Sequence, residues 1–130
     1  MNDYYHFENK VFVVIKPHFE SLSPKVIKMF MDEGFLLCKS RPKLLTHLEA
    51  QKLYRVHQKE EFFNNLVKYM SSGISVGILF QHRYDTKTAF EKVQRIKDAV
   101  REKYSESDMR NVLHSSDNLE NMEREARIYF

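Results

Sequence analysis

The 130-residue chain is predicted to fold as one α/β domain, an α+β sandwich in which helices cover a four-stranded antiparallel sheet. Two observations lead to this fold class. Two continuous apolar segments have the composition of central strands that are buried on both faces. Segments with helical spacing of apolar residues alternate with the strands, as in layered α/β and α+β domains. Hydrophobic residues make up 42% and charged residues 30%, which is ordinary for a globular protein.

The first predicted strand covers 11–15 and reads VFVVI. It ends at Lys16-Pro17, because proline cannot continue a central ladder. Ser23-Pro24 is expected to open the first helix, with serine at the N-cap and proline at the first helical position. The chain therefore begins with a central strand followed by a helix.

The second strand is expected directly after Gly34, a natural helix end, and covers 35–39. Cys38 within it is predicted to be a buried strand residue. Residues 46–49 spell T-H-L-E, a capping box that opens another helix. A further helix is predicted over 60–70, where apolar residues recur at helical spacing.

The third strand is predicted over 74–80, which reads ISVGILF. Residues 88–91 form a possible capping box for a long amphipathic helix. A short strand is expected near 112–113, and Asp117 or Asn118 then caps the last helix. The resulting order, β-α-β-α-α-β-α-β-α, fits a ferredoxin-like βαββαβ sheet with helices on one face.

Composition and motifs narrow the function classes. The net charge of +3 favours phosphorylated small molecules or, weakly, nucleic acid. No apolar segment approaches the ~18 residues of a membrane span, and the polar start lacks a secretory pattern. Together with a single cysteine, this predicts a cytoplasmic protein. No histidine pair has zinc spacing, and the glycine-rich phosphate loops are absent, so side chains would have to hold any nucleotide.

The tract RNVLHSSD, residues 110–117, is the strongest candidate for chemistry. His114 follows a short apolar strand and precedes a capped helix, so rigid backbone would hold its imidazole beside the hydroxyls of Ser115 and Ser116. For this tract taken alone, a surface histidine before a helix N-cap is the commoner explanation.

The wider sequence resembles the nucleoside diphosphate kinases. Their signature has the form N-x-x-H-G/A-S-D-S, and residues 111–118 read N-V-L-H-S-S-D-N. VFVVIKP is similar to the family's first strand, residues 52–73 to its helical hairpin and S-G-P turn, and REARIYF to its ending. The resemblance covers 11–130 apart from one gap, and the pieces are specific because they occur in order.

The resemblance implies covalent catalysis through a phosphohistidine. In this family an unprotonated imidazole attacks the γ-phosphate of a nucleoside triphosphate, and a nucleoside diphosphate then takes the phosphoryl group. By resemblance His114 is the nucleophile. Glu125 matches the glutamate that orients the ring through the nitrogen that does not attack, and Ser116 matches a serine close to that glutamate. Without the resemblance, Glu125 would be a solvated helix charge.

The resemblance also implies how the phosphates are held. Phosphoryl transfer depends on positioning and charge stabilisation, so cations must surround the phosphates. Lys16 and Arg101 match the family's lysine and one of its two arginines, and Tyr54 matches the tyrosine near the phosphate and the histidine. Mg²⁺ would arrive with the nucleotide, bound by phosphate oxygens and water, with no metal ligands from the protein.

The remaining contacts implied by the resemblance fall on the nucleoside. Asn111 matches the asparagine that contacts the sugar, while Phe62 and Leu66 match an apolar clamp on the base. Stacking accepts any base, so ATP and other nucleoside tri- and diphosphates are the expected ligands. For Phe62 alone, core packing is the likelier role.

The gap in the resemblance lies between Arg95 and Arg101. The family has a glycine-, proline- and threonine-rich loop there that contacts phosphate and helps build trimers, and the chain reads RIKDAVR instead. Arg95 matches the family's other arginine. One helix over 86–104 would place the two arginines on different faces, since six residues rotate by ~100° each. A homo-oligomer, a dimer or higher, is expected.

Two alternatives stay open at this stage. The chain could be a catalytically altered nucleotide-binding module that senses, sequesters or hydrolyses a nucleotide. It could also be a small basic sheet that binds RNA through exposed aromatics, although no K/R-G-F-G-F-V-type segment occurs in the strands.

Overall fold

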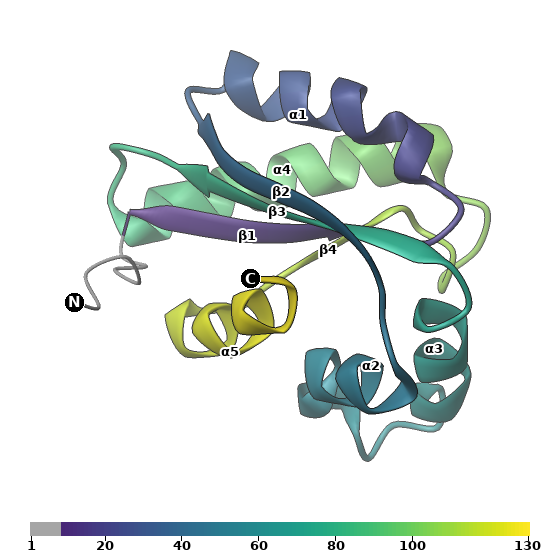
Figure 1. The fold of residues 1–130 in the computed structure, drawn as a ribbon. Helices are drawn as coiled ribbons and strands as arrows, with labels where there is room; N and C mark the ends of the chain where they lie inside the picture. The colour runs from purple at the N-terminus through teal and green to yellow at the C-terminus, as the bar shows by residue number, and fades with distance from the viewer. Residues whose placement is uncertain (1–8) are drawn as a thin grey trace.

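The structure, a computed structural model, describes residues 9–130 (Figure 1). The prediction that a secretory signal is absent rests on the polar start of the chain. That segment lies mostly outside the described residues. The described strands are β1 (Lys10–Ile15), β2 (Leu36–Leu44), β3 (Ile74–Gln81) and β4 (Leu113–Ser115). The helices are α1 (Ser23–Asp32), α2 (His47–Leu53), α3 (Phe63–Met70), α4 (Thr86–Tyr104) and α5 (Leu119–Tyr129), with short 3₁₀ turns η2 (Glu20–Leu22) and η3 (Arg55–His57).

The four strands form one antiparallel sheet in the order β2-β3-β1-β4. The two apolar segments predicted to be central, β1 and β3, occupy the middle of the sheet. The predicted ferredoxin-like α+β architecture is therefore confirmed. Within residues 9–130, none of the helices combines the length and hydropathy that crossing a membrane requires.

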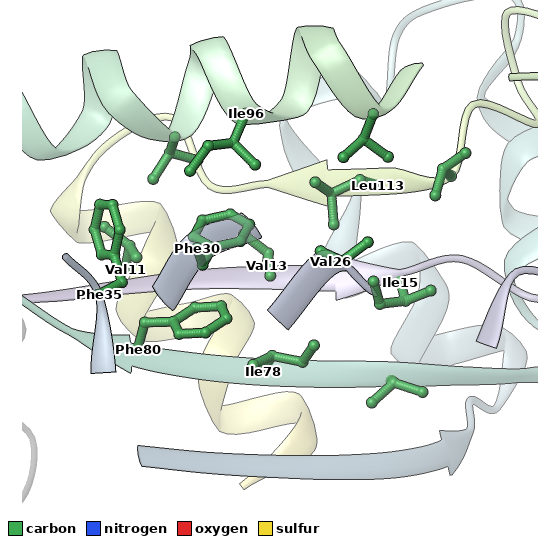
Figure 2. Close-up of a cluster of buried hydrophobic side chains, with 14 of the residues drawn as sticks. Val11, Val13, Ile15, Val26, Phe30, Phe35, Ile78, Phe80, Ile96 and Leu113 are labelled. Atoms are coloured by element: carbon green, nitrogen blue, oxygen red, sulfur yellow. The ribbon is translucent and has the colours of Figure 1, made fainter. Parts of the chain in front are cut away.

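Helices cover both faces of the sheet, so the expectation of helices on one face is wrong (Figure 1). On β1, Val11 and Val13 pack in a cluster with residues of α1 and α4 (Figure 2), whereas Phe12 and Val14 pack with residues of α2, α3 and α5. Successive side chains of a strand point to opposite faces, so an uninterrupted apolar strand requires cover on both sides.

Two predicted N-caps are wrong, although α1 does begin at Ser23 as expected. The N-cap of α1 is Leu22, because the 3₁₀ turn η2 precedes the helix; the Ser23 hydroxyl instead donates a hydrogen bond to the Glu20 carbonyl at 2.7 Å. In α4 the N-cap is Asp85, whose carboxylate accepts from the backbone N–H of Thr88 at 2.8 Å. The helix thus begins one turn before the predicted capping box.

Two other predicted caps are confirmed. Thr46 and Glu49 form the reciprocal capping box at the start of α2. Of the two residues expected to cap α5, Asn118 is the one that does so, by accepting from the backbone N–H of Asn121. This cap fixes where α5 starts and therefore which of its side chains face the sheet.

The prediction that Cys38 is buried is wrong, because β2 is an edge strand. Within the described residues β2 pairs with β3 alone and runs to Leu44, beyond the predicted end at Lys39. Pro42 is tolerated there because an edge strand does not need every backbone N–H for its ladder. Cys38 is a free, exposed thiol.

Candidate active site

A cavity of about 520 Å³ lies at the edge of the sheet formed by β4, with lining residues from α4, α5 and the segment that joins α2 to α3. The structure gathers most of the residues that the sequence singled out around it. Those that line it are Lys16, Tyr54, Phe62, Leu66, Arg101, Asn111, His114 and Glu125. Ser116 lies behind Glu125, and Arg95 is exposed away from the cavity.

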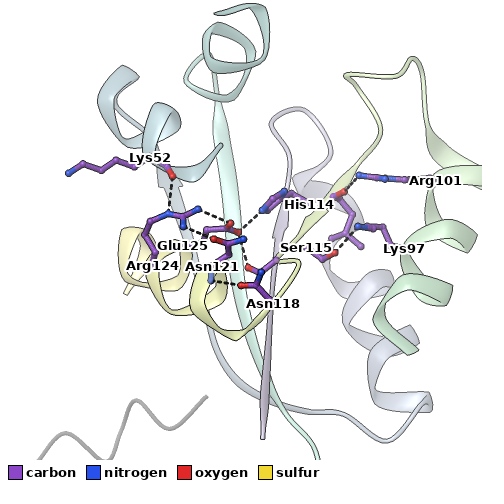
Figure 3. Close-up of polar contacts among 11 residues, drawn as sticks. Lys52, Lys97, Arg101, His114, Ser115, Asn118, Asn121, Arg124 and Glu125 are labelled. Atoms are coloured by element: carbon purple, nitrogen blue, oxygen red, sulfur yellow. Dashed lines mark hydrogen bonds and ion pairs between the residues drawn. The ribbon is translucent and has the colours of Figure 1, made fainter. Parts of the chain in front are cut away.

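His114 is held through one ring nitrogen. Its Nε2 lies 2.7 Å from Oε1 of Glu125, a residue that is 1% exposed (Figure 3). The hydroxyl of Ser116 donates to the same oxygen at 2.8 Å, and Arg124 lies 3.3 Å from Oε2. A carboxylate accepts hydrogen bonds, so this contact places the proton of the neutral ring on Nε2 and leaves Nδ1 with its lone pair.

The local sequence explains why these groups meet. In the three-residue strand β4, His114 projects to the side of the sheet that α5 covers, and Glu125 lies on the buried face of that helix. Just before β4, Val112 has φ of 77°, and the Leu113 N–H donates to the Asn111 carbonyl, closing a γ-turn. A β-branched residue in this conformation is strained, and such strain collects at functional sites.

Three cations line the cavity, and none of them forms an ion pair with a carboxylate among the described residues. Lys16 at the end of β1, and Lys97 and Arg101 on α4, all line it. Burial, followed by the positive charges of Arg101 and Lys97, lowers the pKa of Lys16 to about 7. Burial also lowers the pKa of Lys97, with Arg101 as the next cause. An anion in the cavity would restore the charged form of both lysines.

Three buried polar atoms lack a hydrogen-bond partner among the described residues. They are the Tyr54 hydroxyl, Nε of Arg101 and Oδ1 of Asn111, and all three residues line this cavity. The ring of Tyr54 also packs edge-on against His114, with centroids 4.9 Å apart. Buried polar atoms are normally paired, so this clustering indicates a site built for a polar ligand.

One part of the lining is apolar. Phe62 is 48% exposed, whereas Leu66 is buried, and His57 lies 5.5 Å from the Phe62 ring between centroids. This part can accept a flat, apolar group, while the cations can accept an anion. Within residues 9–130 no group of three or more His, Cys, Asp or Glu side chains is arranged to hold a metal ion.

The expectation for Arg95 is not met, because α4 runs unbroken from Thr86 to Tyr104. Arg95 therefore points to solvent on another face of the helix from Arg101. Sequence reasoning missed Lys97, although it precedes Arg101 by four residues and residues four apart share a helix face. Within one helix, that spacing was the signal that could have found it.

Comparisons with known proteins agree on one family. The family profile described as "Nucleoside diphosphate kinase" matches residues 9–130. A nucleoside diphosphate kinase of Hyperthermus butylicus is 31% identical, over 93% of this chain and 91% of its own length, and one of Methanococcus maripaludis is 29% identical, over 93% and 97%. A crystal structure of the Aquifex aeolicus nucleoside diphosphate kinase has the same fold, with a TM-score of 0.82 at 23% identity over 94% of each chain.

Proposed function

The chain belongs to the nucleoside diphosphate kinase family, and we propose that Nδ1 of His114 carries the phosphoryl group that it transfers. The activity of the family is phosphoryl transfer from a nucleoside triphosphate to a nucleoside diphosphate. One observation carries the assignment of the transfer to His114. Its Nε2 is hydrogen-bonded to Glu125, and its ring lines a cavity that three cations also line.

In the first half-reaction Nδ1 attacks the γ-phosphorus. The new N–P bond forms as the bond from phosphorus to the β–γ bridging oxygen breaks, and the nucleoside diphosphate leaves with that electron pair. The ring becomes positively charged, and the anionic Glu125 stabilises it through the Nε2 proton. A second nucleoside diphosphate then attacks the phosphohistidine through its terminal phosphate oxygen, and Nδ1 regains its lone pair.

The other residues act by position and charge. Lys16 and Arg101 supply positive charge to the phosphates, where a loose transition state spreads negative charge over the oxygens. The unpaired hydroxyl of Tyr54 can donate to a phosphate oxygen next to His114. Phe62 and Leu66 receive the base, and the unpaired Oδ1 of Asn111 accepts from a sugar hydroxyl.

A divalent cation, Mg²⁺, fits this site when it arrives on the nucleotide. The described residues offer no cluster that would hold a metal by themselves, but they include exposed carboxylates on the cavity wall, Asp108 and Asp117. These can accept hydrogen bonds from the water ligands of the ion. Bound there, Mg²⁺ would neutralise part of the negative charge of the phosphates.

A second copy of the chain is the expected protein partner, with β2 as the contact surface. This nine-residue edge strand is exposed almost throughout and carries Leu36, Leu37 and Leu44, which are 59%, 43% and 57% exposed. An exposed apolar edge strand readily pairs with another strand. Measurement of molecular mass in solution distinguishes a monomer from the homo-oligomer.

The alternatives are less well supported. An RNA-binding sheet needs an exposed face with aromatic residues, and helices cover both faces here. If the chain bound nucleotides without transferring phosphate, the alignment of His114 with Glu125 would have no explanation. A cytoplasmic location, as the sequence predicts, is consistent with the free thiol of Cys38, because such thiols persist in reducing compartments.

Incubation with γ-labelled ATP tests the proposal. The protein is expected to take up an acid-labile, base-stable label, to pass it to any added nucleoside diphosphate, and to lose uptake in His114→Ala. His47→Ala is a matched control, since this histidine is exposed and does not line the cavity. Equal labelling of the His114 variant would refute the proposal.

A further inference from the structure

Lys97 is a buried cation with no role in the function described so far. The residue is 8% exposed, and its Nζ donates a hydrogen bond to the hydroxyl of Ser115 at 2.8 Å (Figure 3). No carboxylate among residues 9–130 forms an ion pair with it. Asp117, Asp98 and Glu125 act on this charge only from a distance, so the buried ammonium lacks a directly bonded anion, and its partner set is incomplete.

The position of Lys97 on α4 places its ammonium group at the cavity. It lies one helical turn before Arg101, whose Nη2 donates to the Leu113 carbonyl at 2.7 Å. Both side chains therefore reach from the same face of α4 to β4, the strand that carries His114 (Figure 3). Both line the cavity together with Lys16 at the end of β1.

Ser115 fixes where the ammonium sits. Neighbouring residues of a strand point to opposite sides, so His114 faces α5 while Ser115 faces α4. Both nevertheless line the cavity, because β4 is the edge strand around which it extends. The Ser115 hydroxyl therefore holds the Lys97 ammonium at the residue that directly follows His114 in β4.

We propose that Lys97 is a phosphate-binding residue of this chain, which contacts a non-bridging phosphate oxygen, and that Ser115 is the residue that positions it. The inference rests on the proposed nucleotide site and deepens it. The lysine supplies the second α4 cation in place of Arg95, which α4 turns toward solvent. The lowered pKa of Lys97 is consistent with a cation that awaits an anion.

Calorimetric titration of the intact protein with ADP and with adenosine tests this contact. Lys97→Met is expected to weaken ADP binding about 10- to 150-fold, since a hydrogen bond to a charged group contributes about 1.5–3 kcal/mol. Adenosine binding is expected to stay the same, because adenosine has no phosphate. Arg95→Met is the matched control on the same helix and should leave both affinities unchanged.

Two more variants separate a phosphate contact from a structural role. Lys97→Arg should recover most of the ADP affinity, because the charge remains, and Ser115→Ala should weaken ADP binding less than Lys97→Met does. Unchanged ADP affinity in Lys97→Met, or an equal loss for adenosine, would overturn the inference.

His114→Ala keeps this test independent of the proposed transfer. That variant is expected to transfer no phosphate, and its own ADP affinity serves as the reference for the double variant. Loss of ADP affinity on adding Lys97→Met to it would support the contact even without turnover. If Lys97→Met makes no difference in that background, the contact does not exist, whatever the outcome for transfer.

Discussion

Raising the pH from about 7 to about 9 is expected to weaken ADP binding about 50-fold, because Lys16 loses its proton in the empty cavity. The pKa of this lysine is about 7 in the free protein, against an ordinary value of 10.5. A polyphosphate beside it favours the charged form, so the pKa rises on binding. The contribution of Lys16 to the affinity is therefore full below the pKa of the free protein, falls as the pH rises above that value, and is gone above the raised pKa of the complex.

The magnitude follows from the protonated fraction of the free lysine. That fraction falls from about one half at pH 7 to about one hundredth at pH 9, which corresponds to roughly 2 kcal/mol of binding free energy. Phosphate groups, with a second pKa of about 6, stay ionised over this range. Lys97, whose pKa is also lowered, adds a change of the same sign.

Titration calorimetry at constant ionic strength measures the effect. Lys16→Arg keeps the charge at every pH and should show a smaller pH dependence, while Lys16→Met should bind weakly throughout. A lysine pKa of about 8 would still give a change of about tenfold. A change of less than about threefold in the unmodified protein would refute the assignment of Lys16 to the phosphate site.

Three further substitutions test the geometry of the site. Glu125→Gln should lower kcat roughly 10²- to 10⁴-fold with little change in KM, because an amide can donate to Nε2 of His114 and favour the wrong tautomer; a kcat within about threefold of normal would contradict this. Tyr54→Phe removes an unpaired buried hydroxyl, so thermal stability should hold or rise by about 1 kcal/mol while transfer slows; unchanged turnover would mean that the hydroxyl has no ligand. Gly77→Ala places a Cβ 2.5 Å from the Tyr129 ring and should cost about 1–3 kcal/mol in denaturant unfolding; an unchanged midpoint would show that α5 does not pack as closely as described.

The layers of the fold could be predicted from the sequence because hydrophobic periodicity reports burial directly. The apolar segment of β1 predicted a central strand, and the structure confirms it. The same segment implied cover on both faces, which the expectation of one helical layer overlooked. The exposure of Cys38 could not be predicted from the neighbouring sequence, because whether a strand lies at the edge of a sheet depends on which strands pair with it.

The site was predictable where residues are held by short-range structure. His114 and Glu125 are eleven residues apart, and β4 and the Asn118 cap determine how they meet. The family resemblance suggested the roles of His114 and Glu125, and the structure shows the hydrogen bond between them. Arg95 was chosen by matching a sequence across a gap, whereas helix geometry selects Lys97.

The most direct test of the central claim is to find which ring nitrogen carries the phosphate. ³¹P and ¹⁵N NMR of the protein labelled at histidine and phosphorylated with ATP can make this assignment. Because Glu125 engages Nε2, one phosphohistidine is predicted, at His114, with phosphorus bonded to Nδ1. Phosphorus on Nε2, on another histidine, or on no histidine at all would contradict the account.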